Sequence, residues 1–424
     1  MSGRRSRPEG AAAAEWRTHW PLVMAGMLGF MMIGVLNFSL GGFMKPLKQA
    51  FGWSLSDITL GMSIYAAVGV VCQPLVGRMI DLWGPRRIGL IGLALTGGAI
   101  ALFATANGSI TMWLGLWFVY SLAAQLVLTP VWSSAVASEF EASRGLALAT
   151  TLSGSGLCGF IVPPVSRAVI DHFGWQRAFP ILGLGAAALL LLVTIPFFHS
   201  RRDRSRAEPG VKAATAVEPT GMPAVEALRS PTFYKLIVAI LVGYTLAMAV
   251  SIHNLELLSS VGLTRKEASW ITAFFGLSAV AGKFISGALV RRVAGHILTA
   301  GMLLLPVASC LLLLMPEPSL AACFVAVALF GISAGAQLQM LVYLTTRHFG
   351  LLAFGSIFGF IGSAMTIAAA VGPMAASKLA DISGDYHLML IIGIPLSVIS
   401  TVVMLWVGDY PEVRAARALA KQAA

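Results

Sequence analysis

Apolar runs of about 20 residues recur along nearly the whole 424-residue chain, and this feature constrains the fold more than any other. A helix of that length rises about 30 Å, which matches the hydrocarbon core of a bilayer. Only 11% of the residues are charged, whereas a soluble domain carries about 25%. Backbone polar groups inside lipid must be satisfied within helices, so the chain is predicted to be an all-α membrane protein.

The runs predict twelve transmembrane helices in two sets of six. The first spans run from about 20 to 44, 57 to 78, 88 to 106, 110 to 137, 145 to 168 and 177 to 198. The others run from about 235 to 258, 268 to 290, 296 to 315, 319 to 345, 354 to 378 and 387 to 407. The predicted organisation is a six-helix bundle with a short cytoplasmic tail (1–198), a polar cytoplasmic linker (199–230) and a second such bundle with its own tail (231–424).

The two sets are related by an internal repeat with an offset of 210 residues. The paired landmarks are Gly52 and Gly262, Ser54 and Thr264, Asp57 and Glu267, Gly77 and Gly287, Gly145 and Gly355, Pro163 and Pro373, Asp171 and Asp381, and Gly174 and Gly384. Two parallel repeats joined by a polar linker predict bundles that rock around a site near the bilayer midplane.

The net charge of +11 comes from basic residues that are distributed as in a membrane protein, and this distribution does not indicate a nucleic-acid-binding surface. Of the 29 Lys and Arg residues, twenty fall on the side of the N-terminus, seven on the other side and two inside spans or at their edges. This asymmetry predicts that both termini are cytoplasmic and that the protein lies in a bacterial inner membrane. No nucleic-acid partner is expected.

Motifs of covalent or cofactor chemistry are missing from the sequence. The four cysteines, Cys72, Cys158, Cys310 and Cys323, lie in apolar segments without disulfide or metal-ligand spacing. No glycine-rich phosphate loop occurs, and no His, Cys or Asp cluster has metal-ligand spacing. We therefore expect no enzyme activity, no cofactor and no bound metal.

The loop after the second span reads Gly77-Arg-Met-Ile-Asp81-Leu-Trp-Gly84-Pro-Arg86-Arg87. It resembles the G-x-x-x-D-x-x-G-x-R-R signature of the major facilitator transporters, and a degenerate copy follows the eighth span. The resemblance implies that Gly77, Asp81, Gly84, Arg86 and Arg87 form a conformational-switch loop, with Asp81 meeting a helix end and nearby basic residues. Alternatively, Arg86 and Arg87 serve only to keep this loop on the cytoplasmic side of the membrane.

Three further stretches, residues 42–54, 144–149 and 171–179, resemble the monocarboxylate transporter and oxalate/formate antiporter group. The resemblance covers essentially the whole chain and implies the major facilitator fold and an organic-anion substrate. The sequence departs from the mammalian pattern, because Asn37 or Phe38 stands where a lysine is expected in the first span. The eighth span also lacks an acid, and Lys378 lies too near the outer end of the eleventh span to match the basic residue of the oxalate carrier.

Lys283 is the strongest candidate for substrate binding. It lies eight residues before Arg291, or about 12 Å inward from the cytoplasmic end of its span. An ammonium near the midplane costs at least about 2.5 kcal/mol on insertion scales, so it should face an aqueous cavity. Its position also resembles that of the basic residue that meets the substrate carboxylate in the family. A snorkelling or structurally paired lysine is the alternative.

Other polar and aromatic residues at middle depth are expected to line the same cavity. Gln339 precedes Arg347 by eight residues, as Lys283 precedes Arg291, and Tyr343 follows one helical turn later on the same face. The remaining candidates are Tyr120, Tyr65 and Asn37. Interhelical packing through hydrogen bonds is the alternative for each of them.

His253 and Glu256 lie toward the outer end of the seventh span and are candidates for proton handling.

No Asp or Glu lies near the middle of any predicted span, so closing the cavity around Lys283 should be less costly with a substrate carboxylate inside. The expected function is therefore transport of a small mono- or dicarboxylate by alternating access. Anion exchange is favoured over proton-linked symport, so a counter-anion or protons are the further partners beside the substrate and the bilayer. An effluxer of drugs or other amphiphiles is the alternative, although the lack of acids in the cavity disfavours cationic cargo.

Overall fold

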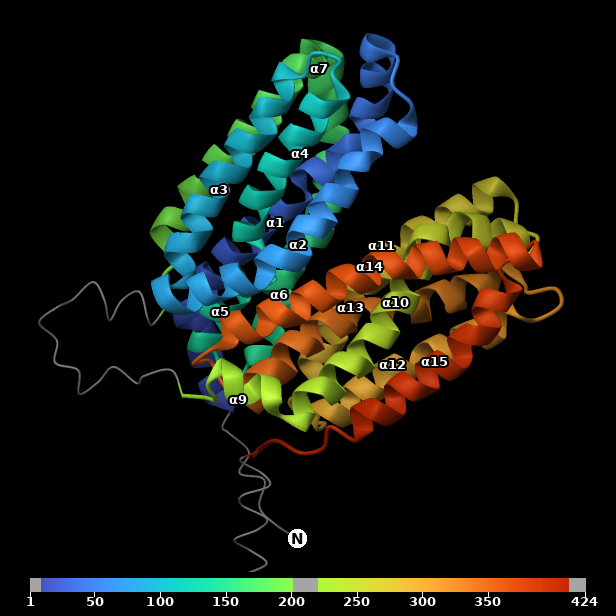
Figure 1. Ribbon diagram of the computed structural model, residues 1–424. Helices are drawn as coiled ribbons and strands as arrows, with labels where there is room; N and C mark the ends of the chain where they lie inside the picture. Colours follow the sequence, from blue (N-terminus) through green and yellow to red (C-terminus); the bar gives the residue numbers. More distant parts are fainter. Residues whose placement is uncertain (1–8, 201–219, 412–424) are drawn as a thin grey trace, which may run out of the picture. The chain divides into compact units, whose positions relative to one another are not determined.

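The computed structural model describes residues 9–200 and 220–411. Regular structure in these two ranges is helical, apart from one isolated bridge between Gly221 and Gly350 (Figure 1). Most of the linker predicted at 199–230 lies outside the described residues, and its described end contains the short helix α9 (Ala224–Arg229).

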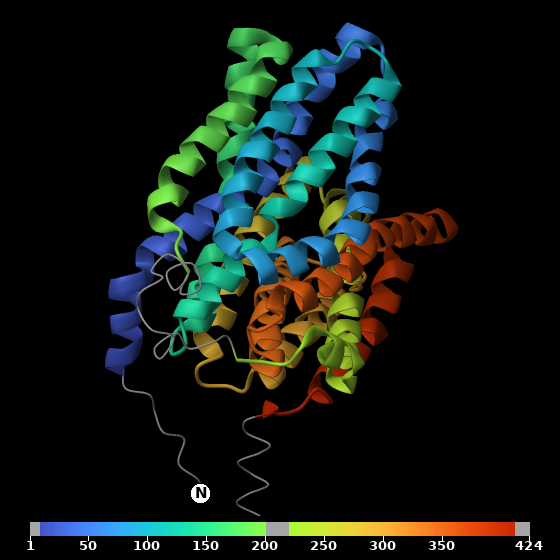
Figure 2. The ribbon, with the colours of Figure 1, turned by 60° about the vertical axis from the view of Figure 1, so that its left-hand side comes forward.

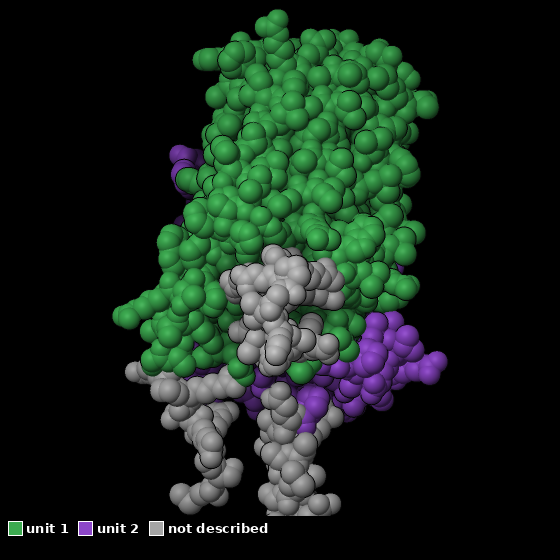
Figure 3. All heavy atoms as spheres, turned by 90° about the vertical axis from the view of Figure 1, so that its left-hand side faces the viewer, with its two compact units in different colours: residues 1–220, 351–363 green, residues 221–350, 364–424 purple. Residues whose placement is uncertain are grey.

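The chain groups into two compact units, which Figure 3 colours separately. Unit 1 comprises residues 1–220 and 351–363, and unit 2 comprises residues 221–350 and 364–424. Helix α14 (Phe354–Ser383) therefore gives its first turns to unit 1 and the rest of its length to unit 2. The domain boundaries drawn from the sequence at 198 and 231 stay a prediction.

Unit 1 is built from long apolar helices, of which α1 and α3 pack along α7, while α2 packs along α4 (Figures 1 and 2). Its helices are α1 (Glu9–Phe51), α2 (Leu55–Trp83), α3 (Pro85–Leu102), η1 (Phe103–Thr105), α4 (Ile110–Ala124), η2 (Gln125–Val127), α5 (Thr129–Glu139), α6 (Arg144–Leu152) and α7 (Gly154–Phe197). Small residues permit this close packing: a Cβ at Gly154 would collide with the carbonyl of Met27.

Unit 2 has the same kind of packing, with α11 against α13, and α12 and α10 against α15. After α9, its helices are α10 (Pro231–Ser260), α11 (Arg265–Leu289), α12 (Gly295–Leu313), α13 (Leu320–Phe349), the larger part of α14, and α15 (His387–Leu405). Its core is apolar and includes Leu257, Cys310, Cys323 and Phe330.

Eleven helical stretches of the described residues are long and apolar enough to cross a membrane. One of them, residues 144–197, has 54 residues, about twice what a single span needs. Gly174 interrupts this stretch with φ 75° and ψ 161°, a conformation that favours glycine. The stretch therefore contains the fifth and sixth predicted spans, and the all-α fold expected from hydropathy is confirmed.

The start of the first helix differs from the prediction. Helix α1 begins at Glu9, whereas the first span was expected from about residue 20. The alanines that follow Glu9 favour a helix, and the Trp16 ring packs edge-on against Phe140 at a centroid distance of 5.3 Å. The helix is thus longer than its membrane-crossing part.

Candidate functional site

The predicted anion site centres on Lys283, in the last third of α11. Glycines bring α11 and α13 close together on either side of it. A Cβ at Gly282 would collide with the carbonyl of Ile332, and one at Gly335 with the carbonyl of Ala279. Lys283 directly follows Gly282 on α11, and its exposed fraction is only 7%.

Lys283 lies six residues before Leu289, the last residue of α11, which corresponds to about 9 Å along the helix axis. One turn after Lys283, the Ser286 hydroxyl donates a hydrogen bond of 2.6 Å to Oε1 of the fully buried Gln339. Residues three apart on a helix share a face, so Lys283 lies on the face of α11 from which Ser286 bonds to Gln339 of α13.

Tyr343 stands one helical turn after Gln339 on α13. Its ring lies against an apolar cluster that includes Val290, Leu298 and Met302. Its backbone carbonyl accepts a hydrogen bond from the Thr346 hydroxyl. The structure thus brings Gln339 next to the turn that carries Lys283, while Tyr343 lies against Val290 at the end of α11 and against α12.

In unit 1 the structure brings Tyr65 of α2 and Tyr120 of α4 together. Their rings stack with a centroid distance of 5.9 Å and an interplanar angle of 29°. Tyr120 is fully buried, and its hydroxyl has no hydrogen-bond partner among the described residues. An unsatisfied buried hydroxyl is costly, which makes Tyr120 available to a polar group that enters from outside the protein.

Asn37, the third predicted site residue of unit 1, donates from Nδ2 to the carbonyl of Ile33 on its own helix at 3.1 Å. It is partly buried. The neighbouring turn of α1 lies close to α7, because a Cβ at Gly34 would fall 2.7 Å from Sγ of Cys158.

The predicted switch loop packs closely against the first turn of α14 within unit 1. The Asp81 carboxylate accepts the backbone N–H of Gly355 at 2.8 Å and that of Ser356 at 2.7 Å, both in the first turn of α14. The close approach depends on Gly77, because a Cβ there would collide with the Gly355 carbonyl. Gly84 ends α2 with φ 88°.

The two arginines of the loop behave differently. Arg86 donates to the carbonyls of Ile195 and Phe198, each at 2.7 Å, and so caps the end of α7. Arg87 is exposed. The loop therefore joins the ends of α2, α7 and α14 by charged hydrogen bonds.

His253 of α10 contacts three polar groups at its end of unit 2. Its Nε2 lies 3.1 Å from the Pro373 carbonyl oxygen and 3.2 Å from the Ser377 hydroxyl, both on α14. Its Nδ1 lies 3.1 Å from the Tyr386 hydroxyl. Glu256, one turn after His253, is exposed.

No group of His, Cys, Asp and Glu within the described ranges is arranged to hold a metal ion. An open groove of about 530 Å³ lies on unit 2 between α11 and α13 and is lined almost wholly by apolar side chains such as Trp270, Phe274 and Phe324. The groove does not include Lys283 or Gln339 among its lining residues.

Three polar residues of these sites escaped sequence reasoning. Ser286 could have been found, because it follows Lys283 at helical spacing. Ser377 and Tyr386 carry no such signal, because their contacts to His253 join residues more than 120 positions apart.

Long apolar helices in two compact units, with buried polar groups among them, are typical of a multi-pass membrane protein. The chain belongs to the Major Facilitator Superfamily, whose family model matches residues 26–257 and 236–423. This assigns it the two-repeat transporter fold and a multi-pass place in a membrane.

Known proteins agree with this membership. The chain is 28% identical over 374 residues to an MFS-type transporter of Gibberella moniliformis, covering 87% of this chain and 84% of the relative. It is 23% identical over 372 residues to monocarboxylate transporter 13 of Bos taurus, with coverage of 87% and 84%. The crystal structure of the E. coli fucose:proton symporter shares the fold, with a TM-score of 0.70 at 16% identity, over 91% of this chain and 98% of that one.

Proposed function

We propose that this transporter moves a small organic anion, a mono- or dicarboxylate, by alternating access. The observation that carries the proposal is the burial of Lys283, one helical turn before Ser286, whose hydroxyl donates to Gln339. A buried ammonium with hydrogen-bonding neighbours suits a carboxylate, which needs a positive charge and several donors. The relative named as a monocarboxylate transporter supports the same substrate class.

Tyr120, Tyr65, Asn37, Gln339 and Tyr343 are proposed to contribute to substrate binding together with Lys283. The Tyr120 hydroxyl supports this role, because it is a buried donor without a partner among the described residues. A carboxylate oxygen or a substrate hydroxyl would satisfy it.

The direct test compares Lys283→Gln with Lys283→Arg in proteoliposomes. The Gln variant should lose carboxylate uptake because it lacks the charge, while the Arg variant should retain part of it. Lys235→Gln is the control, because Lys235 is a partly buried lysine at the start of α10 whose ammonium donates to the Trp406 carbonyl. Uptake by the Lys283→Gln variant at wild-type rate and affinity would disprove the proposal.

We place the protein in a bacterial inner membrane with both termini in the cytoplasm, on the strength of the positive charge on one set of loops. Reporter fusions to each terminus test this topology. A periplasmic signal from either fusion would reverse it.

Anion exchange is the proposed mode of coupling, with proton-linked symport as its competitor. A substrate carboxylate near the Lys283 ammonium lowers the cost of closing the cavity, so the loaded carrier should reorient faster than the empty one. Preloading vesicles with unlabelled substrate should then accelerate entry of labelled substrate. Equal rates with and without preloading, together with stimulation by an inward proton gradient, would favour symport.

A further inference from the structure

The groove on unit 2 runs between α11 and α13, at the end of the unit where both helices begin. Its volume is about 530 Å³, and its apolar walls include Trp270, Ile271, Phe274 and Leu277 of α11 and Leu320 and Phe324 of α13. The rings of Phe274 and Phe324 stack across the two helices at a centroid distance of 4.2 Å. Trp270 and Leu277 are 73% and 63% exposed, so the described residues leave the groove uncovered.

The position of the groove favours a cover of lipid hydrocarbon. Both of its walls belong to helices that are long and apolar enough to cross a membrane. Phe274 precedes Lys283 by nine residues, or about two and a half helical turns, so the groove lies on the face of α11 opposite the predicted anion site. From Glu267 to Leu277 the lining face rises about 15 Å, which is the depth of one leaflet of the hydrocarbon core. One acyl chain therefore matches the groove in length and in chemistry.

The groove ends in a pair of opposite charges at the start of α11. Oε2 of Glu267 accepts the backbone N–H of Thr264 at 3.0 Å and its hydroxyl at 2.5 Å. Oε1 of Glu267 accepts no hydrogen bond from the residues that the structure describes, and the neighbouring Lys266 is exposed. An acid beside a base complements a zwitterionic headgroup, whose ammonium donates to Glu267 while its phosphate binds Lys266. Trp270, one turn further on, is of the type that favours the membrane–water interface.

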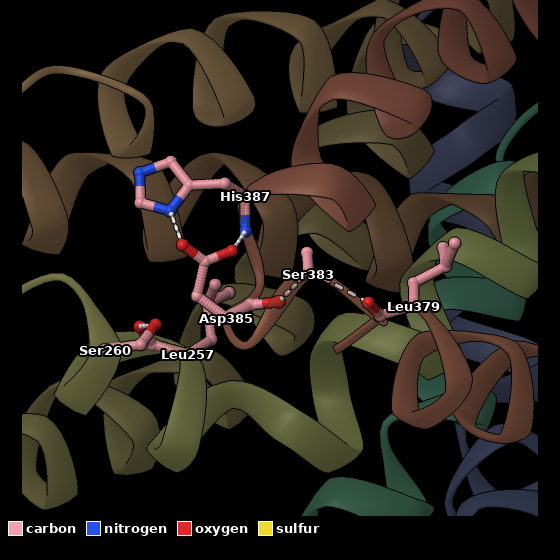
Figure 4. A network of polar contacts seen from close by, with 6 residues as sticks. All are labelled: Leu257, Ser260, Leu379, Ser383, Asp385 and His387. Carbon is pink, nitrogen blue, oxygen red and sulfur yellow. Dashed lines mark hydrogen bonds and ion pairs between the residues drawn. The ribbon is translucent and has the colours of Figure 1, made fainter. Parts of the chain in front are cut away.

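Asp385, an acid at the same end of unit 2, has its carboxylate bonded within its own turn. It accepts the backbone N–H of His387 at 2.9 Å and lies 2.8 Å from Nδ1 of the same residue (Figure 4). The Ser383 hydroxyl donates to the Asp385 carbonyl at 2.7 Å and holds this turn further. Of these two acids, Glu267 is the one that has a free oxygen beside an apolar groove.

The repeat counterpart in unit 1 has the same capping acid without the aromatic walls. Asp57 accepts the Ser54 backbone N–H at 2.9 Å at the start of α2. Leu60 and Ile64 stand at the positions that correspond to Trp270 and Phe274. The Trp117 ring of α4 packs directly on Gly61 of α2, where a Cβ would fall 2.1 Å from the ring. Asp57 is therefore a matched control for Glu267.

We propose that the groove binds one acyl chain of a phospholipid of the phosphatidylethanolamine class, with the headgroup ammonium donating to Oε1 of Glu267. The trimethylated headgroup of phosphatidylcholine has no N–H to donate, and the carboxylate repels an anionic headgroup. The groove accommodates the chain, and Glu267 selects the headgroup. This site is separate from the proposed anion site and does not depend on it.

The lipids retained by the purified full-length chain test this selectivity. After equilibration in vesicles with equal amounts of phosphatidylethanolamine and phosphatidylcholine, native mass spectrometry of the wild type should show about a tenfold preference for phosphatidylethanolamine, as expected from one charge-assisted hydrogen bond. Glu267→Gln removes the charge but keeps a side chain that can complete a capping box, so the preference should fall to within about twofold. Asp57→Asn should keep the preference of the wild type.

Fluorescence places the bound chain in the groove. In phosphatidylcholine vesicles with 10% brominated-chain phosphatidylethanolamine, a tenfold preference should fill about half of the sites with a brominated chain, against about a tenth without preference. The emission that is lost in Trp270→Phe should be quenched accordingly in the wild type. Trp406→Phe is the control, because Trp406 is also exposed but lies at the end of α15.

Equal retention of the two lipids by the wild type would overturn the proposal, as would an equal loss of preference in Asp57→Asn. Stronger retention of phosphatidylglycerol from mixed vesicles would assign the groove to an anionic lipid, and a second copy of the chain seated on Trp270 would assign it to a dimer. Either result would also overturn the proposal. Neither measurement involves carboxylate uptake, so failure of the lipid site would leave the proposed function standing, and failure of uptake would leave the lipid site standing.

Discussion

Two helix starts related by the internal repeat are both held by carboxylates, but by different ones. Gly355 in the first turn of α14 is the repeat partner of Gly145 in the first turn of α6. At α14 the carboxylate is Asp81, which accepts two backbone N–H groups. At α6 it is Glu15, which accepts the backbone N–H groups of residues 141–143 at 2.8–3.0 Å and the Ser143 hydroxyl at 2.8 Å.

The difference lies in what each carboxylate joins. Helix α14 belongs to unit 1 only as far as Ser363, so the bonds of Asp81 anchor a helix that continues into unit 2. Glu15 and its partners all lie within the first 220 residues, in one unit. Orphan N–H groups and the helix dipole favour an anion at both places. The same local chemistry is therefore expected to affect movement at α14 and only stability at α6.

Of the changes at these two helix starts, Asp81→Asn is expected to have the larger effect on transport rate. The asparagine side chain is uncharged, and one of its two ends is an NH₂ group that cannot accept a hydrogen bond. At least one of the two bonds from the backbone N–H groups is therefore lost. Turnover should fall by about tenfold if the lost bonds contribute about 1.4 kcal/mol to the preferred state. The substrate affinity, measured by thermal shift or equilibrium binding, should change by no more than about threefold. A loss of binding as large as that of Lys283→Gln would contradict a role in switching.

Asp81 was predictable because it belongs to a recognisable loop, whereas Glu15 was not. Hydropathy placed the spans because a bilayer imposes a length on every apolar helix. The repeat offset, visible in landmarks such as Gly145 and Gly355, indicated two related halves. Glu15 lies in an alanine-rich segment that looked like a tail, and its contact with residues 141–143 depends on how α1 packs against α5 and α6. Such long-range contacts leave no periodic signal in one sequence.

The same limit applies to the candidate anion site. Lys283 was expected to face an aqueous cavity because an ammonium within a span is costly, whereas its exposed fraction is 7% and it does not line the groove on unit 2. The partner of Gln339 was not expected, because the Ser286 bond crosses from α11 to α13. Tyr343 shares a helix face with Gln339 by spacing, but its large ring packs against an apolar cluster instead. The spacing of residues predicts on which face of a helix a side chain lies, whereas the packing of the neighbouring helices determines which residues that side chain contacts.

Glu15→Gln should have a smaller effect on transport than Asp81→Asn. The amide keeps one acceptor for three backbone donors, so the start of α6 loses part of its charged hydrogen bonding at a cost of about 1–2 kcal/mol. The thermal unfolding midpoint should fall by about 2–6 °C. Transport per folded molecule should stay within a factor of about two. A turnover defect as large as that of Asp81→Asn would erase the contrast between the two helix starts.

The smallest effects are expected at a second repeat-related pair, the capping boxes at Ser54 and Thr264. Asp57 accepts the Ser54 backbone N–H at 2.9 Å, and Glu267 accepts the Thr264 backbone N–H at 3.0 Å. The return bonds to the Ser54 and Thr264 hydroxyls measure 3.1 Å and 3.4 Å.

Because both boxes are exposed and lie in different units, Ser54→Ala and Thr264→Ala should each cost about 1 kcal/mol and should add in the double variant. Tryptophan fluorescence during heating should show midpoint shifts of at most about 2–4 °C for each change, with Ser54→Ala the larger because its return bond is shorter. Uptake should be unchanged in both, since each box only begins a helix within its own unit. If one box alters turnover while the other does not, the two halves differ in function at positions where their local structure is the same.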